Sequence, residues 1–262
     1  MSERPVALIT GPTSGIGLHL AELLARDGYD LVLVARNAEV LARLTRDWTQ
    51  RYDIRIRPIA IDLSRAGAVE TVVTTVREHG LHLTVLVNNA GVGVYGLFAN
   101  TPLEHERGLL HLNILALTEL TKSFLPDLRE SKGHILNVSS TAAFEPGPYM
   151  AVYYASKAYV LSFSEAIAEE LARDGVQVTA LCPGLTRSGF QHAAGMERSG
   201  LLRLPEMDAC KVAEAGYRAM LKGKRVAIPG LFNRILVASI RFTPRRWVTR
   251  LVAWLSRPKQ NT

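Results

Sequence analysis

Short apolar runs alternate with helical patterns along most of the chain, and this alternation limits the folds that the chain can adopt. The runs are rich in β-branched residues and are predicted as strands at residues 6–9, 31–34, 54–61, 83–87, 134–138, 176–181 and 225–228. Helical patterns separate them at residues 16–24, 38–52, 65–79, 101–129 (broken once), 151–173 and 208–221. Strands that alternate with helices favour a parallel sheet covered on both faces. We therefore predict a single α/β domain built on a doubly wound parallel sheet.

The composition is that of an ordinary globular protein. Of 262 residues, 48% are hydrophobic and 21% are charged, which allows a sizeable core. Cys182 and Cys210 match no metal or redox spacing, which favours a reducing compartment. The first residues show no signal peptide, and no apolar run approaches the roughly 18 residues of a membrane-spanning helix. A cytoplasmic location is predicted.

Positive charge is concentrated toward the carboxyl end. The formal net charge is +7, and the residues from Lys211 onward contribute +11, from 12 Lys and Arg against the single acid Glu214. The first 210 residues therefore carry a net charge of −4. A uniformly basic protein would indicate nucleic-acid binding, whereas a basic tail on a mildly acidic body indicates that the tail has its own partner.

A glycine-rich loop follows the first predicted strand and opens the first predicted helix. It reads Thr10-Gly11-Pro12-Thr13-Ser14-Gly15-Ile16-Gly17. In such a turn a nucleotide pyrophosphate meets free backbone N–H groups and the positive end of the helix dipole, and glycines let the backbone approach the phosphates. Any tight strand–helix turn can contain glycine, but the position of this loop after a buried strand predicts cofactor binding.

The end of the second predicted strand bears on the choice of cofactor. In folds of this kind an acid about 20 residues beyond the glycine loop binds the ribose hydroxyls of NAD. Here the strand ends in Val34-Ala35-Arg36-Asn37, without an acid, and Arg36 lies 19 residues after Gly17. Its guanidinium could bind a 2′-phosphate through paired hydrogen bonds, although it could also be a solvated surface arginine. The missing acid favours NADP(H) over NAD(H).

Tyr153 and Lys157 lie four residues apart in a predicted helix, so both side chains project from one face. Tyrosine is a poor base at neutral pH, and a nearby ammonium lowers the pKa of its hydroxyl. The pair could therefore exchange protons near neutrality. Tyr154 points about 100° away around the helix. Taken alone, this spacing is most often a packed ring beside a solvated amine.

Several further motifs follow the glycine loop in a recognisable order. They are Asp62, Asn88-Asn89-Ala90-Gly91, Asn113, Asn137-Val138-Ser139-Ser140, Tyr153 with Lys157, and Cys182-Pro183-Gly184. Taken together over residues 5–230, the sequence resembles the short-chain dehydrogenase/reductase family. The resemblance implies a Rossmann-type fold and an oxidoreductase that transfers hydride between a nicotinamide and a carbonyl or alcohol group.

The resemblance also implies catalytic roles. Tyr153 is expected to protonate the carbonyl oxygen in reduction, and Lys157 is expected to lower its pKa and to bind the nicotinamide ribose. The family's serine precedes the tyrosine by 13 residues, which selects Ser140 to bind the substrate oxygen. The adjacent Ser139 should point to the opposite face of its strand. Asn113 is expected to support a water that links Lys157 to solvent.

The implied cofactor contacts come from the glycine loop and from later strand ends. Asp62 and Leu63 are expected beside the adenine, and Asn89 is expected to brace the site. Many NADP-dependent relatives carry a basic residue where this chain has Ser14, which leaves Arg36 as the main reader of the phosphate. The full set predicted to bind NADP(H) is Gly11, Thr13, Ser14, Gly15, Ile16, Gly17, Arg36, Asp62, Leu63, Asn89, Ala90, Gly91, Tyr153, Lys157, Pro183, Gly184 and Thr186. No metal is implied.

Apolar residues are predicted on the substrate side of the site. They are Phe144, Tyr149, Met150, Leu185, Phe190, Met196, Leu201 and Leu202. The last five belong to a predicted loop at residues 185–205, and loops of that length are usually lids, binding loops or disordered segments. Several of these side chains could simply pack in the core. The set favours an apolar small-molecule substrate that is lipid-, steroid- or acyl-like.

The chain continues beyond the family's minimal end. We predict a catalytic domain at residues 1–230 and a basic, amphipathic helical extension at 231–262. Residues 247, 248, 251, 254 and 255 form one apolar stripe, and Arg246, Arg250 and Arg257 fall on the other side. Interfacial membrane helices show this pattern. A helix packed on its own domain or on a neighbouring subunit also fits it and is the preferred interpretation.

Two functions of different kinds fit these observations. The main prediction is an NADP(H)-dependent oxidoreductase acting on a carbonyl or alcohol of an apolar small molecule. The alternative is a catalytically silent protein that senses NADP(H) or scaffolds partners, and the joint presence of the four catalytic candidates argues against it. We expect a homo-oligomer, dimer or tetramer, and no nucleic-acid partner. Peripheral membrane contact is considered only through the extension.

Overall fold

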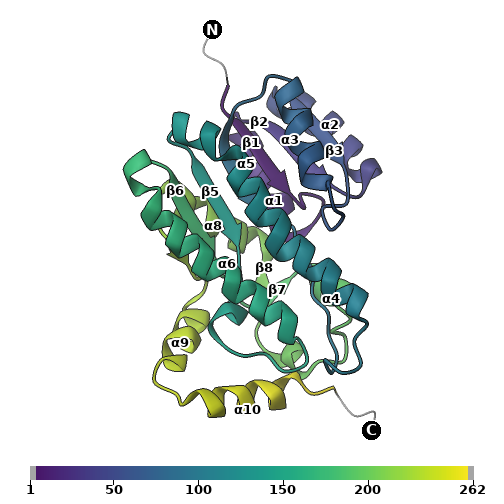
Figure 1. The fold of residues 1–262 in the computed structure, drawn as a ribbon, viewed down its shortest axis with the longest axis vertical. Helices are drawn as coiled ribbons and strands as arrows, with labels where there is room; N and C mark the ends of the chain where they lie inside the picture. Colours follow the sequence, from purple (N-terminus) through teal and green to yellow (C-terminus); the bar gives the residue numbers. More distant parts are fainter. Residues whose placement is uncertain (1–3, 259–262) are drawn as a thin grey trace.

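A parallel sheet of seven strands forms the centre of the molecule (Figure 1). The computed structural model describes residues 4–258, so the first three residues of the predicted catalytic domain and the last four of the predicted extension lie outside the described residues. Neighbouring strands all run parallel, in the order β3-β2-β1-β4-β5-β6-β9. They are β1 (Val6–Thr10), β2 (Asp30–Ala35), β3 (Ile56–Ala60), β4 (Leu83–Asn88), β5 (His134–Val138), β6 (Gln177–Leu181) and β9 (Val226–Ala227). The predicted α/β fold is confirmed.

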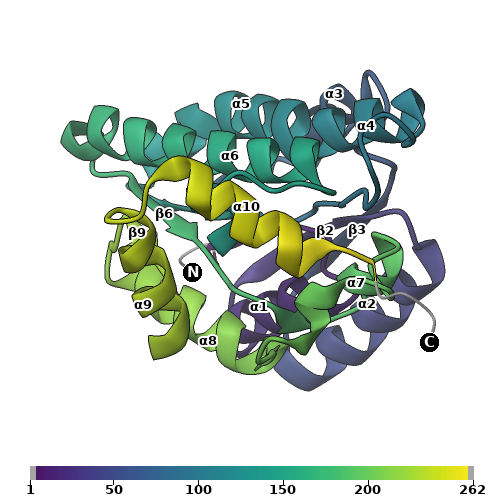
Figure 2. The same cartoon turned by 90° about the horizontal axis from the view of Figure 1, so that it is seen from below.

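Helices cover both faces of the sheet (Figure 2). One layer contains α3 (Ala68–Glu78), α4 (Leu103–Leu110), α5 (Leu117–Glu130) and α6 (Ala151–Glu170), and the other contains α1 (Gly15–Arg26), α2 (Ala38–Tyr52) and α8 (Ala209–Leu221). Successive residues of β1 pack against the two helical layers alternately. Val6 and Leu8 belong to one apolar cluster, and Ala7 and Ile9 belong to the other. Burial on both faces explains why the central strands are continuous apolar runs in the sequence.

The predicted helix over residues 101–129 is divided by a π-helical turn. α4 leads directly into the turn His111–Ala116, which continues into α5. π-Helical turns are rare, and they occur frequently at functional sites. This one holds Asn113, of which 1% of the surface is exposed. The predicted break in the helix is therefore a π-helical turn and not a loop. The turn places the side chain of Asn113 in contact with Ser156 on α6.

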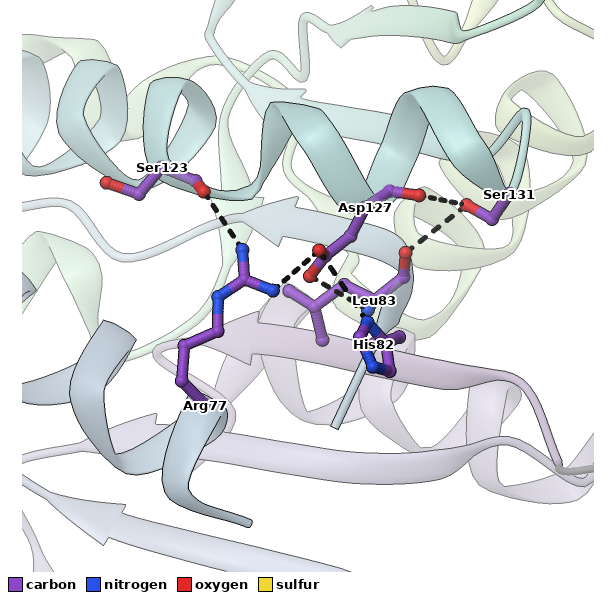
Figure 3. A network of polar contacts seen from close by, with 6 residues as sticks. All are labelled: Arg77, His82, Leu83, Ser123, Asp127 and Ser131. Carbon is purple, nitrogen blue, oxygen red and sulfur yellow. Dashed lines mark hydrogen bonds and ion pairs between the residues drawn. The ribbon is translucent and has the colours of Figure 1, made fainter. Parts of the chain in front are cut away.

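A buried carboxylate holds the start of β4 between two helices (Figure 3). Asp127 on α5 accepts a 2.6 Å hydrogen bond from Arg77 on α3 and a 3.4 Å bond from the backbone N–H of Leu83. Ser131 donates to the carbonyl groups of Leu83 (3.2 Å) and Asp127 (2.8 Å). The Asp127 side chain is only 5% exposed, and a buried charge needs such donors. The network lies at the amino-terminal end of the sheet and leaves the opposite end to the loops.

The carboxyl-terminal third differs from the predicted elements in two places. Residues 185–205 are not a plain loop: they contain β7 (Thr186–Arg187), which pairs with β8 (Met207–Asp208), then α7 (Phe190–Ala193) and a 3-10 turn, Gly200–Arg203. The predicted helical extension holds two helices, α9 (Leu231–Ile240) and α10 (Arg245–Ser256), and the predicted apolar stripe belongs to α10 alone. Both lie at the same end of the molecule as α7 (Figures 1 and 2). Within residues 4–258 no helix is long and apolar enough to cross a membrane.

Only one side of α10 meets the protein. Val248, Val252 and Ser256 are buried, and the Tyr95 hydroxyl donates a 2.6 Å hydrogen bond to the carbonyl of Ser256. Trp247 and Trp254 remain 54% and 66% exposed. The predicted apolar stripe is therefore not a single surface, because Val248 turns inward while the two tryptophans face away. Packing on the protein's own domain, the preferred interpretation from the sequence, accounts for the buried side alone.

Candidate active site

A cavity of about 480 Å³ opens at the carboxyl ends of the central strands. From β1 the strands that follow in sequence, β2 and β3, lie on one side, whereas β4 and the later strands lie on the other. Parallel α/β sheets bind ligands at the point where the strand order reverses in this way. The glycine loop, the ends of β2, β4, β5 and β6, and helix α6 all contribute to its wall. Every predicted catalytic and cofactor residue lines this cavity except Gly17 and Asn113, which lie directly behind it.

The glycine loop has the shape that a pyrophosphate requires. Gly11 and Gly15 have φ angles of +68° and +56°, which side-chain-bearing residues rarely adopt. Ser14 begins α1 without a capping hydrogen bond from its side chain. The first N–H groups of the helix are therefore available to an anion, at the positive end of the helix dipole. These features fit the phosphates of a dinucleotide cofactor.

Asn89 joins the glycine loop to the end of β4. Its amide donates to the carbonyl of Thr10 (2.9 Å) and to the carbonyl of Gly11 (3.0 Å). The Thr10 hydroxyl accepts in return from the backbone N–H groups of Asn89 and Ala90. Gly17 packs so closely against Asn89 that a Cβ at this position would overlap the amide. Asn89 thus holds the glycine loop against the end of β4, and its role at a bound cofactor stays a prediction.

Arg36 and Asp62 line the cavity near the ends of β2 and β3. Arg36 is exposed at the end of β2, and within residues 4–258 it forms no hydrogen bond or ion pair. Asp62 accepts two bonds from Ser64, from its backbone N–H (3.0 Å) and from its hydroxyl (2.7 Å). Burial opposes the charge of Asp62, but these bonds and the nearby Arg36 hold the pKa of its carboxyl below the ordinary value. The guanidinium is thus positioned at the cavity with its hydrogen-bonding capacity unused.

Tyr153 and Lys157 share one face of α6 and reach the cavity together. The Lys157 ammonium lies 5.8 Å from the centre of the Tyr153 ring and donates a 2.8 Å bond to the carbonyl of Val138. Burial raises the pKa of Tyr153 to about 12, and its hydrogen bond with Ser140 acts in the opposite direction. Burial lowers the pKa of Lys157 to about 8. The pKa of Tyr153 is set here by burial and by Ser140, not by Lys157, so the expected lowering by Lys157 stays a prediction.

The two adjacent serines have different surroundings. Ser140 is hydrogen-bonded with Tyr153 and accepts a 3.1 Å bond from the backbone N–H of Ala142, at the start of a 3-10 turn. The hydroxyl of Ser139 instead donates to the carbonyl of Lys157 at 2.8 Å. The structure thus brings Ser140 to the tyrosine, while Ser139 attaches β5 to α6. Both serines lie just beyond β5, which ends at Val138, and their hydroxyls bond to different partners.

Asn113 supports the site from behind. Its amide nitrogen donates to the carbonyl of Val92 and to the hydroxyl of Ser156, both at 3.0 Å, and its amide oxygen accepts from the N–H of Val92. The Ser156 hydroxyl then donates to the carbonyl of Tyr153. These bonds tie the π-helical turn to the part of α6 that carries Tyr153 and Lys157. The predicted water link to Lys157 stays a prediction.

The substrate end of the cavity is largely apolar. Five of the eight predicted residues line it, Met150, Leu185, Phe190, Met196 and Leu201, whereas the other three, Phe144, Tyr149 and Leu202, do not. The sequence reasoning missed a second group of lining residues: Ala142, Glu145, Tyr154, Ala193, Leu204, Pro205, Phe232, Asn233 and Leu236. The last three come from α9. No local sequence pattern could identify these three residues, because their position depends on how α9 packs near the cavity in the folded protein.

The sequence matches the short chain dehydrogenase family over residues 5–198. The chain belongs to the short-chain dehydrogenase/reductase family. A short-chain dehydrogenase from Sphingobium yanoikuyae, solved in complex with NADPH, is 32% identical with a TM-score of 0.80 over 91% of this chain and 94% of its own. The bulky-bulky ketone specific alcohol dehydrogenase of Comamonas testosteroni is 30% identical, with a TM-score of 0.77 over 92% and 94% of the two chains. The very-long-chain 3-oxoacyl-CoA reductase of Rattus norvegicus is 31% identical over 92% of this chain and 76% of its own.

As a short-chain dehydrogenase/reductase, the protein is an oxidoreductase that acts on carbonyl or alcohol groups with a nicotinamide cofactor. The residues present fit that cofactor. The side chain of Ser14 does not cap the N–H groups at the start of α1, and Gly17 has no room for a side chain, so α1 packs close to the glycine loop. The alternative of a catalytically silent sensor receives no support from these observations.

Gly17→Ala should destabilise the protein and weaken cofactor binding. The added Cβ would overlap the Asn89 amide and the carbonyl of Gly11, and crowding of this kind costs about 1–3 kcal/mol. Urea unfolding and cofactor titration measure both effects. Gly108→Ala, in α4, is the control, because a Cβ there meets no atom within 4 Å and should be neutral or slightly stabilising. Equal stability of the two variants would contradict the close packing at Asn89.

Proposed function

We propose that the protein is an NADP(H)-dependent reductase of apolar ketones, able to run in reverse on the corresponding alcohols. One observation carries the proposal: a single cavity joins the glycine loop and Arg36 to Tyr153 and Ser140, and then to an apolar wall built by α7 and α9. A dinucleotide laid along the loop would thus end beside the tyrosine. The remaining space suits the apolar body of a substrate.

The proposed chemistry uses the protein's residues at the substrate oxygen. When bound, the reduced nicotinamide supplies a hydride to the carbonyl carbon. Tyr153 gives its hydroxyl proton to the carbonyl oxygen, so that the product is the neutral alcohol. Ser140 holds that oxygen by a hydrogen bond, and Lys157 restores the proton of Tyr153 and binds the nicotinamide ribose. Because burial raises the pKa of Tyr153 to about 12, the hydroxyl keeps its proton at neutral pH, as a proton donor must.

Tyr153→Phe should abolish turnover and leave cofactor binding intact, because it removes only the hydroxyl. General acid catalysis typically contributes a factor of about 100 or more, so the rate of NADPH oxidation with an apolar ketone should fall at least that far. Tyr154→Phe is the matched control on the neighbouring residue and should be far milder. Turnover of the Tyr153→Phe variant near the wild-type rate would sink the catalytic assignment.

The preference for NADP(H) is proposed from Arg36. The guanidinium lies at the cavity, is exposed, and forms no hydrogen bond or ion pair within the described part of the chain. A planar cation in this position suits a 2′-phosphate, and the end of β2 has no acid that would select the ribose hydroxyls of NAD. The solved relative from Sphingobium yanoikuyae was crystallised with NADPH, which supports the same choice.

Arg36→Asp should shift cofactor preference from NADPH toward NADH. A charge-assisted hydrogen bond contributes roughly 1.5–3 kcal/mol, so the dissociation constant for NADPH should rise about tenfold or more, while NADH binding should tighten. Fluorescence titration of both cofactors gives the constants. Arg43→Asp, an exposed arginine of α2 away from the cavity, controls for the change in net charge. If both dissociation constants are unchanged in Arg36→Asp, this arginine is not the phosphate reader.

An apolar substrate is proposed from the wall of the cavity and from the relatives. Met150, Phe190, Met196, Phe232 and Leu236 line the end beyond Tyr153. One relative is named for bulky ketones and another for very-long-chain 3-oxoacyl-CoA. A lipid-, steroid- or acyl-like ketone is the class that agrees with both observations.

Self-association is proposed through the layer of α4, α5 and α6. Leu103, Leu110, Leu115 and Tyr159 lie in or beside these helices with 37 to 62% of their surfaces exposed. Exposed apolar side chains gathered in one layer are typical of protein interfaces. A homo-oligomer, dimer or tetramer, would cover them.

The extension, residues 231–262 beyond a catalytic unit of residues 1–230, is proposed as a surface for anionic membranes on an otherwise cytoplasmic protein. Seven of its large apolar side chains have more than half of their surface exposed. They are Leu231, Phe232, Ile235, Phe242, Trp247, Leu251 and Trp254. Six arginines and no acid accompany them in residues 231–257. Exposed apolar groups interspersed with arginine suit the interface of an anionic bilayer.

The same surface adjoins the cavity. Phe232 lines the cavity and is also 51% exposed. An apolar substrate dissolved in the bilayer could therefore reach Tyr153 past α9 without crossing water. This continuity links membrane contact to the proposed substrate class.

The double variant Trp247→Glu/Trp254→Glu should lose membrane binding. Wild-type protein should sediment with vesicles containing phosphatidylglycerol at low salt and be released at high salt, since each basic residue near an anionic surface contributes about 1 kcal/mol. Phe98→Glu removes an equally exposed apolar side chain (66%) outside the extension and should sediment like wild type. If wild type does not sediment, the membrane proposal fails. A change in oligomeric state of the double variant would instead assign the surface to a second subunit.

A further inference from the structure

Among the described residues, Glu145 is the one ionisable side chain of the cavity that is neither a predicted cofactor residue nor part of α6. The ionisable residues lining the cavity are Arg36, Asp62, Glu145, Tyr153, Tyr154 and Lys157. Arg36 and Asp62 line the cavity near the ends of β2 and β3, and Lys157 lies with Tyr153. Glu145 lines the substrate end, where its neighbours are mostly apolar.

The Glu145 carboxyl has no polar partner. Within residues 4–258 it accepts no hydrogen bond and forms no ion pair. It is half-buried, and burial alone raises the pKa of its carboxyl to about 7. Its charge also raises the pKa of Tyr154, whose ring packs on Gly147, two residues along the chain. A half-buried carboxyl without a protein partner has lost part of its hydration, so a ligand hydroxyl that bonds to it would gain binding energy here.

The segment that carries Glu145 is held rigidly against α6. Pro146 and Pro148 restrict the backbone on either side of Gly147. Gly147 lies directly on the ring of Tyr154, where a Cβ would overlap the ring carbons. The 3-10 turn Thr141–Phe144 connects this segment to Ser140. Glu145 is therefore presented at a set position relative to the proposed catalytic serine, as a specificity group requires.

We propose that Glu145 is a specificity-determining residue that accepts a hydrogen bond from a hydroxyl group carried by the substrate away from its reacting carbonyl. The proposal deepens the proposed function and rests on it for the position of that carbonyl. A hydroxyl fits better than a cation, because the protonated and ionised forms of the carboxyl both retain an acceptor oxygen. A substrate lacking the hydroxyl leaves the carboxyl unpaired, and sites with unpaired polar groups reject such analogues strongly.

The test compares a linear ketone with analogues that carry one hydroxyl at increasing distances from the carbonyl. NADPH oxidation is followed for wild type, Glu145→Leu and Glu145→Gln. Wild type should favour one hydroxylated ketone over the plain ketone by roughly tenfold or more in kcat/KM, the size expected for a hydrogen bond to a carboxylate. Glu145→Leu should lose that preference, and Glu145→Gln, which keeps an acceptor oxygen, should retain part of it. Glu170→Leu, an exposed carboxylate at the end of α6, should leave the ratio unchanged.

Two results would overturn the proposal. One is a wild-type enzyme with no preference among the ketones; the other is a Glu145→Leu variant in which kcat/KM falls equally for plain and hydroxylated ketones, which marks a structural role. Calorimetric binding of the same ketones separates this inference from the proposed function. If no ketone is reduced but binding still favours a hydroxylated ketone in wild type and not in Glu145→Leu, Glu145 keeps its role and the proposed reaction fails.

Discussion

The Asn89 amide is the junction on which the cavity depends. It holds the turn between β1 and α1 against the end of β4 through the carbonyl groups of Thr10 and Gly11. The two halves of the sheet wind outward from this point in opposite directions, so their loops separate and leave a crevice. Gly17 allows α1 to approach close enough for the junction to form. Backbone N–H groups at the start of α1 then face the crevice without a capping bond from the side chain of Ser14.

Burial governs the chemistry of the tyrosine and lysine pair. Removing Tyr153 from water raises the pKa of its hydroxyl, and removing Lys157 from water lowers the pKa of its ammonium, because burial penalises the charged form of each group. The Val138 carbonyl accepts a bond from the ammonium and offsets part of that penalty. Asn113, held in a π-helical turn, fixes the backbone of α6 through Ser156. The site is therefore held both by a hydrogen bond at the cavity wall, between Lys157 and Val138, and by the bonds of Asn113 and Ser156 behind it.

One side of the extension packs against the cavity and the core, and its opposite side is exposed. Its inner side supplies Phe232 and Leu236 to the cavity, and Val248 and Val252 to the apolar cluster around Met150 and Tyr154. Its outer side exposes two tryptophans and a set of arginines. A helix whose apolar residues lie on both of its sides cannot bury all of those residues against a single domain. That excess of apolar surface is the physical basis for assigning the outer side an external partner.

The sequence by itself determined the layered α/β fold, the glycine loop and the pairing of Tyr153 with Lys157. These features depend on local patterns: continuous apolar runs, a turn that only glycine permits, and the four-residue repeat of a helix. The tertiary structure alone decided the direction of the Tyr153 pKa shift, because desolvation depends on every group packed around the ring. It also decided that Glu145 and Phe232 face one cavity. Residues so distant in sequence meet only through the path of α9 across the molecule, and no local pattern records that path.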